Sequence, residues 1–149
     1  MGTKRSDRLK RVAEHFAGDR DLASRKLVEL RSAMDGAEQR LEELRAYLDA
    51  YHAELDQIRR AGTSSAKLQN YTAFLSQLRA ALEQQERHAE QARDAFEQQM
   101  AVWYQARSQV RAVEQAAERT VAVERKVQDR VEQRELDELA RYRFLEKQG

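Results

Sequence analysis

Few residues of this chain have the types and the spacing that catalysis or metal binding requires. The three histidines, His15, His52 and His88, lie far apart, and none forms the His-Glu-x-x-His pattern of zinc enzymes or the Glu-x-x-His pair of di-iron bundles. The chain has no cysteine, which excludes a disulfide, a thiolate zinc site and a cysteine nucleophile. A glycine-rich phosphate-binding loop is also lacking. We therefore predict that the protein is not an enzyme and uses no metal or cofactor.

The charged residues, which make up 36% of the chain, have the spacing of a solvent-exposed helix face. Acidic and basic side chains are interspersed, as in Glu42, Glu43 and Arg45, and such patterns form weak surface ion pairs. The formal net charge is +1, whereas a general nucleic-acid-binding protein has a strong basic excess. No apolar stretch approaches the ~20 residues that a membrane span needs. We expect neither nucleic-acid binding nor direct membrane insertion.

The elements that must position any site are indicated by two long runs of apolar residues, spaced alternately by three and four. The first run covers residues 27–58, and the second covers residues 68–117 with Gln85 and Gln99 at two of its positions. This spacing is the seam of a left-handed coiled coil, because a helix then presents one narrow stripe every ~3.5 residues. The absence of proline and the abundance of strong helix formers agree with two long helices.

A short polar break, Gly62-Thr63-Ser64-Ser65, separates the two runs. Gly62 suits the left-handed position that ends a helix, and Ser64 or Ser65 can cap the next one. So short a break forces the chain to fold back on itself. We therefore predict an all-α fold of two long helices in an antiparallel coiled-coil hairpin, with the second helix longer and overhanging. The expected bounds are about 5–60 for the first helix, 61–65 for the turn and about 66–145 for the second helix, within a single domain of residues 1–149.

The break also sets the register of the two helices. If Ile58 packs near Leu68, then Ala37 faces Ala89 in a thin layer where the helices can approach closely. The two glutamines in the seam cost stability, and we interpret them as markers of the register.

Two further expectations concern the start of the first helix. Ser6 is a candidate N-cap, because its hydroxyl can accept from a free amide of the first turn. Leu9, Val12 and Phe16 occupy one heptad frame and Ala23 begins another, so we expect a slip of four residues between them.

The overhanging end of the second helix carries apolar residues with no partner in the chain. An isolated helix gains little stability from propensity alone. One interpretation is a frayed tail, and the preferred one is that another protein covers this stripe. Its residues are Val123, Val127, Val131, Leu136, Leu139 and Leu145.

A second apolar strip lies beside the seam near the turn. Phe74 is on a flanking position, and with Leu78, Ala81 and Leu82 it forms a strip down one side of the second helix. A single exposed phenylalanine is common, but an apolar strip near the tip of a hairpin suggests a docking site.

The order of these features along the chain is similar to that in a known protein family. The strip and its flanks contain Asn70, Tyr71, Phe74, Leu78, Ala81 and Leu82. Together with Trp103, the Ala-, Gln-, Glu- and Arg-rich stretch after it and the segment 136–140, this pattern resembles the FliJ proteins of bacterial flagellar export. The resemblance extends over nearly the whole chain. Each motif is weak by itself, and their combination carries the resemblance.

The resemblance implies a cytoplasmic central-stalk component of the flagellar type III export apparatus, located at the periphery of the inner membrane. The implied partners are a hexameric export ATPase, whose ring assembly the stalk promotes, the cytoplasmic side of a membrane export gate, and export chaperones that the protein escorts. The family's gate-binding strip matches Phe74, Leu78 and Ala81, and Gln85 is the next position on it. The ATPase-facing end matches Phe16 and the overhang residues Val123, Val127, Val131, Leu136 and Leu139.

Two alternatives remain open from the sequence. The stalk of a virulence-type secretion injectisome would have the same fold and mechanism. A generic coiled-coil adaptor or spacer would have the same periodicity but no specific docking residues.

Overall fold

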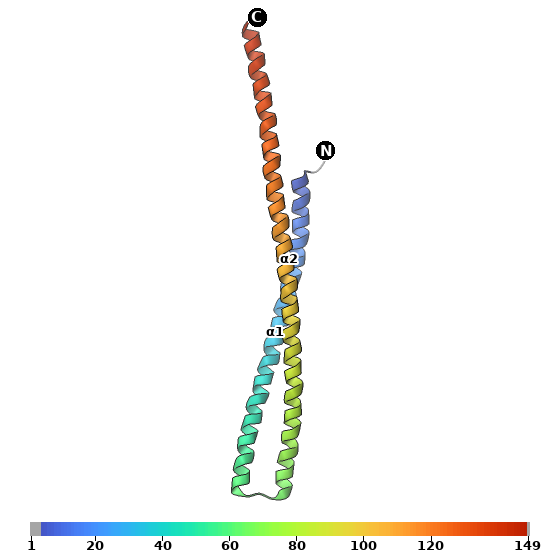
Figure 1. The fold of residues 1–149 in the computed structure, drawn as a ribbon, viewed down its shortest axis with the longest axis vertical. Coiled ribbons are helices and arrows are strands. Elements are labelled where there is room, and N and C mark those ends of the chain that lie inside the picture. Colours follow the sequence, from blue (N-terminus) through green and yellow to red (C-terminus); the bar gives the residue numbers. More distant parts are fainter. Residues whose placement is uncertain (1–3, 149) are drawn as a thin grey trace. The chain divides into compact units, whose positions relative to one another are not determined.

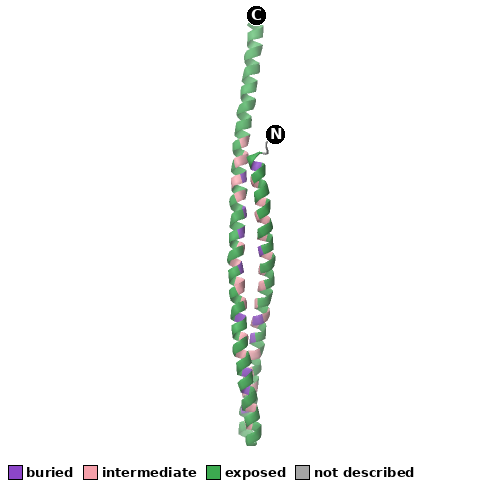
Figure 2. Cartoon of the chain, turned by 90° about the vertical axis from the view of Figure 1, so that its right-hand side faces the viewer, coloured by how far each residue is buried: buried purple, intermediate pink, exposed green. Residues whose placement is uncertain are grey.

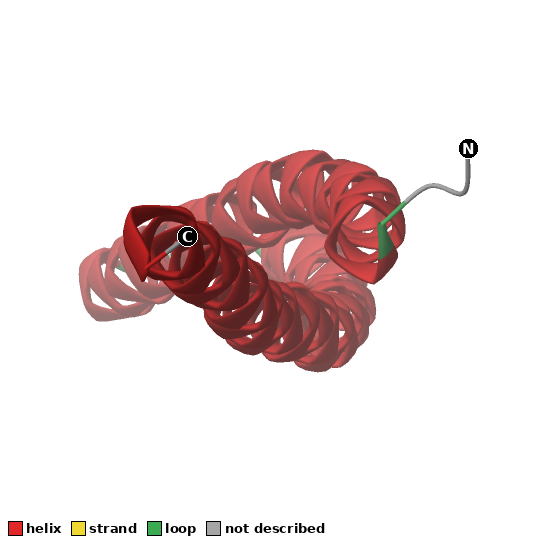
Figure 3. Cartoon of the chain, turned by 90° about the horizontal axis from the view of Figure 1, so that it is seen from above, coloured by secondary structure: helices red, strands yellow, loops and turns green. Residues whose placement is uncertain are grey.

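The computed structural model of the protein describes residues 4–148, which form two α-helices. Helix α1 covers Arg5–Ala61 and helix α2 covers Ser65–Gln148. The two helices pack against each other (Figure 1), and the described residues contain no strand (Figure 3). The predicted all-α hairpin with a longer second helix is therefore confirmed.

The turn between the helices has the geometry that its residues favour. Gly62 has a φ of 84°, in the left-handed region that glycine adopts without strain. The Ser64 hydroxyl accepts a hydrogen bond from the amide of Lys67 at 3.3 Å, and the Ser64 carbonyl accepts one from the amide of Leu68 at 3.1 Å. Ser64 is thus the N-cap of α2, and α1 ends before Gly62.

The chain divides into two compact units, which are described separately. One unit is residues 22–104, and the other is residues 1–21 together with residues 105–149. The expectation of a single domain stays a prediction.

The hairpin of residues 22–104 is held together by the predicted seam. Every seam position of this unit is buried or half-buried, including both glutamines. The tightest layer contains Ala37, Leu41 and Ala89, with Leu82 and Ala92 packed against them. Figure 2 shows buried and half-buried positions along the facing sides of the helices. The small side chains of Ala37 and Ala89 let the two backbones approach.

In the other unit, Ser6 is not the N-cap that the sequence suggested. Helix α1 begins one residue earlier, and the carbonyl of Lys4 accepts from the amides of Asp7 and Arg8 at 3.1 and 3.2 Å. Ser6 is only 3% exposed because it faces α2. Its hydroxyl is therefore used between helices and not to cap one.

The expected slip of the heptad near the start of α1 is also wrong. Val12 is 43% exposed, and Ala13 is half-buried in its place. The frame reaches Ala23 without a break because Arg20 is half-buried at a seam position. The aliphatic stem of an arginine can pack against apolar surface while its charge stays in water, so this residue type conceals a seam position. The uninterrupted seam of this segment consists of Ser6, Leu9, Ala13, Phe16, Arg20 and Ala23.

The seam of α2 ends at Glu124. From residue 125 to residue 148 every position is exposed, and this segment extends beyond the start of α1 (Figures 1 and 2). At ~1.5 Å per residue the overhang is roughly 36 Å long.

Candidate docking surfaces

Four aromatic rings from both helices gather near the turn, and we call them the tip cluster. The ring of Phe74 lies 4.8 Å from that of Tyr51 and 6.5 Å from that of Tyr47, and Tyr51 lies 5.4 Å from Tyr71, measured between ring centroids. The residues meet because Tyr47 and Tyr51 are one helical turn apart on α1, and Tyr71 and Phe74 are one turn apart on α2. Aromatic pairs at these distances add to the stability that burial alone gives.

The tip cluster combines a packed base with accessible edges. Phe74 is 39% exposed and Tyr47 is 53% exposed, while Tyr51 and Tyr71 are half-buried. Desolvation by its neighbours raises the pKa of the Tyr51 hydroxyl, and the nearby Tyr71 and Glu54 raise it further. The accessible aromatic edges can receive an apolar side chain of a partner.

The predicted strip on α2 divides into accessible and seam residues. Phe74 and Ala81 are exposed, and Ala81 lines a shallow hollow together with Leu44 of α1. Leu78 is only 7% exposed and belongs to the core. Gln85 is half-buried, and its Nε2 donates to the carbonyl oxygen of Ala37 at 3.1 Å. Phe74 and Ala81 are thus the strip residues that a partner can reach.

Tyr47 is the member of this surface that sequence reasoning missed. It flanks the seam residue Leu48, and the sequence alone favours packing as the role of its ring. The signal that could have found it is the pair Tyr47 and Tyr51. Their one-turn spacing puts two aromatic rings on the side of α1 that lies next to the strip on α2.

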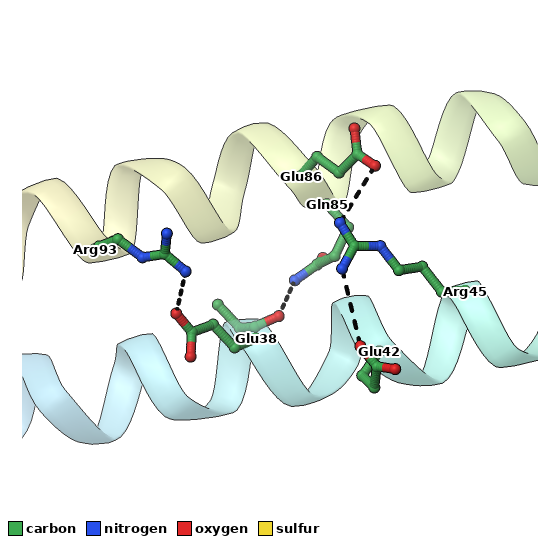
Figure 4. A network of polar contacts seen from close by, with 7 residues as sticks. Glu38, Glu42, Arg45, Gln85, Glu86 and Arg93 are labelled. Atoms are coloured by element: carbon green, nitrogen blue, oxygen red, sulfur yellow. Dashed lines mark hydrogen bonds and ion pairs between the residues drawn. The ribbon is translucent and has the colours of Figure 1, made fainter.

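The charged residues between the helices form exposed pairs. Arg93 donates to Glu38 at 2.7 Å, and this hydrogen bond raises the pKa of Arg93. Arg45 lies 3.7 Å from Glu86 and 3.8 Å from Glu42 (Figure 4). Exposed pairs of this kind contribute about 0–1 kcal/mol each. Among the described residues, no group of three or more histidine or acidic side chains is arranged to hold a metal ion.

A polar contact lies at the end of the seam in the unit of residues 1–21 and 105–149. The Ser6 hydroxyl donates to Oε2 of Glu124 at 2.6 Å, and the Ser6 amide donates to Oε1 at 3.2 Å. The hydroxyl hydrogen bond is the main cause of a lowered pKa at Glu124, and Lys4 and Lys10 contribute to it. Phe16, which the resemblance assigns to the ATPase-facing end, is half-buried against α2 and lies 5.9 Å from the ring of His15.

The lowered pKa of Glu124 predicts a pH-dependent stability. Because the folded state favours the ionised carboxylate, Glu124 stabilises the fold above the ordinary glutamate pKa of about 4.3, and this contribution is lost as the pH falls through its lowered pKa. Thermal unfolding of the parent chain and of Glu124→Gln should therefore differ at neutral pH, and the difference should disappear as the pH falls below the lowered pKa of Glu124. A difference that stays constant over this range would mean that ionisation of Glu124 is irrelevant to the contact.

The apolar residues of the overhang do not form one stripe. At ~100° per residue, Leu136 lies on the opposite face of α2 from Val127. Val131, Tyr142 and Leu145 fall within about 60° of Val127 and form what we call the overhang face. All of these residues are exposed, as are Val123 and Leu139.

The overhang face continues the seam. Val127 and Val131 follow Glu124 with the same spacing of three and four. A groove lined by Lys4, Val121, Val123 and Val127 opens where α1 begins. Sequence reasoning missed Tyr142, although the expected second helix, which ends at about residue 145, already places it within about 60° of Val127. Within the described residues, neither helix has a stretch that is apolar enough to cross a membrane.

Comparison with known proteins gives one result. The sequence model of the family described as flagellar FliJ protein matches residues 5–149. This match includes both the tip cluster and the overhang. No curated protein and no solved structure matches the chain.

Proposed function

Because the chain belongs to the family of flagellar FliJ proteins, which are stalk components of the flagellar export apparatus, we propose that it links the hexameric export ATPase to the export gate. In this proposal it is a non-enzymatic, cytoplasmic stalk, peripheral to the inner membrane, that promotes assembly of the ATPase ring and escorts export chaperones. The observation that carries the proposal is that each of the two units has its own uncovered apolar surface. The flagellar description of the family favours this apparatus over the injectisome.

The surface that we assign to the export gate is the tip cluster with Ala81. Phe74 and Tyr47 offer exposed ring edges above a rigid base, so little side-chain freedom is lost when a partner binds. The exposed Ala81, two helical turns further along α2, lines a hollow with Leu44 that has room for an apolar side chain of the gate protein. Leu78 and Gln85 support this surface from the seam.

The surface that we assign to the ATPase ring is the overhang. The overhang face extends the line of the seam beyond α1, so a helix of the ring can pack there as α1 packs on the rest of α2. Leu136 and Leu139 give apolar contacts on other sides of the helix. A stalk surrounded by ring subunits requires contacts on several faces, whereas a single partner helix requires only one. Binding to the assembled ring in preference to free subunits favours assembly by linkage.

The test is ATP hydrolysis by the cognate export ATPase, with ring assembly followed in parallel. We expect stimulation by the full chain and its loss when residues 125–149 are deleted. Residues 125–148 are exposed at every position, so the thermal unfolding of the remaining hairpin should be nearly unchanged. The matched control is Phe74→Ala, which leaves the overhang intact and should stimulate fully. If the full chain neither binds nor stimulates the ATPase, the protein is a coiled-coil adaptor with other partners.

A further inference from the structure

Both seam glutamines of the hairpin of residues 22–104 make the same contact across the interface. Nε2 of Gln85 donates to the carbonyl oxygen of Ala37, and Nε2 of Gln99 donates to that of Ala23, each at 3.1 Å. Figure 4 shows Gln85 reaching from α2 toward α1. The donors lie two heptads apart on α2, and the acceptors lie two heptads apart on α1. The two contacts are therefore one motif that occurs twice.

The motif works because its acceptors are alanines. Ala37 and Ala23 are buried and have no side chain beyond Cβ, so a glutamine of α2 can reach the helix backbone. A helical carbonyl oxygen that already accepts from its own helix has a second lone pair for this bond. No buried side-chain nitrogen or oxygen atom among the described residues lacks a hydrogen-bond partner. In the observed register, both polar groups of the seam are thus satisfied.

A slip of one heptad would leave these groups unsatisfied. The seam positions one heptad before and after Ala37 are Leu30 and Leu44, whose larger side chains cover the backbone. Midway between the two glutamines, α2 has Ala92, so at positions one heptad apart small and large residues alternate on both helices in this region. One heptad of slip would place Gln85 against a leucine and Gln99 against Leu30 or Phe16. A buried amide without a partner is strongly unfavourable, so the motif discriminates against the shifted register.

The register matters for the surface at the tip. The tip cluster exists only where Tyr47 and Tyr51 of α1 stand beside Phe74 of α2. One heptad is ~10.5 Å along a helix, far more than the contact distance of two rings. We propose that Gln85 and Gln99 are positioning residues, which lock the helix register and thereby assemble the docking surface from both helices. The proposal about docking rests on the proposed function of the tip cluster, whereas the register lock does not.

The test compares the parent chain with Gln85→Leu/Gln99→Leu. Apolar residues in the seam should raise the melting temperature, while binding to the cytoplasmic part of the export gate should fall at least several-fold. A purely structural role of the glutamines would change both quantities in the same direction. The matched control is Gln91→Leu/Gln105→Leu, which makes the same change at two exposed positions of α2 with the same two-heptad spacing and away from the tip cluster. This control should leave binding and register unchanged.

Cross-linking reports the register directly, because the chain has no cysteine of its own. Cysteines at positions 38 and 93 report the native register, in which Glu38 and Arg93 are paired, and pairs 38/86 and 38/100 report slips of one heptad. A short bifunctional reagent should link only 38/93 in the parent chain and also a shifted pair in the double leucine variant. If the variant links only 38/93 and binds like the parent, the short turn alone sets the register and the proposal is overturned. If the parent itself does not bind the gate, the proposed function fails, and the cross-links still decide the register lock.

Discussion

Replacement of Phe74 by alanine is expected to weaken binding to the cytoplasmic part of the export gate roughly 30-fold or more, while the melting temperature falls much less than for the core truncation Leu78→Ala. Phe74 is the exposed centre of the tip cluster and touches both Tyr47 and Tyr51. Aromatic residues in such positions commonly act as binding hot spots that contribute about 2 kcal/mol or more, which corresponds to a loss of affinity of roughly 30-fold. Titration calorimetry with the purified gate domain measures this loss.

Three further variants define what the Phe74 result means. Tyr47→Ala should also weaken binding, because its ring packs against Phe74 at the exposed surface. Val102→Ala removes an exposed apolar residue elsewhere on α2 and should have no effect. Leu78→Ala should instead destabilise the fold by about 2–5 kcal/mol, because this side chain is in the core. If Phe74→Ala lowers the melting temperature as much as Leu78→Ala does, Phe74 is a core residue and not a docking residue.

The hairpin could be predicted from the sequence because its physical cause is periodic. An apolar stripe with spacings of three and four has one favourable partner, a second such stripe, and the chain supplies both on either side of Gly62. The turn could be predicted equally well, because Gly62 and Ser64 each suit one particular backbone position. Local propensity and long-range packing agree throughout this part of the chain.

Prediction from the sequence failed where a residue has a role that is unusual for its type. Ser6 suggested a helix cap but donates to Glu124, and Arg20 suggested solvent but lies half-buried in the seam. The contacts of Gln85 and Gln99 could not be predicted either, because a backbone carbonyl acceptor has no signature in the sequence. The proposed docking surface shows the same limit, since Tyr47 becomes part of it only through its position beside Phe74.

The second large effect is expected at Ala37, where leucine should destabilise the hairpin by about 1–3 kcal/mol. Ala37 is 0% exposed and packs with Leu41 and Ala89 in the tightest layer of the seam. Additional carbon atoms at this position must push the helices apart or displace their neighbours. The melting temperature, followed by circular dichroism, should fall by several degrees, since about 1 kcal/mol corresponds to roughly 2–4 °C for a chain of this size.

Ala53→Leu is the matched control for this substitution, because it adds the same atoms at an exposed position of α1 and should leave the melting temperature unchanged. The leucine at position 37 would also cover the carbonyl oxygen that accepts from Gln85. Ala37→Leu should therefore permit the slipped register in the cross-linking assay, as the double leucine variant does. If Ala37→Leu is as stable as the parent, the helices are not closely packed at this layer. The contact of Gln85 with the backbone depends on that close approach, so the register lock would then lose its physical basis.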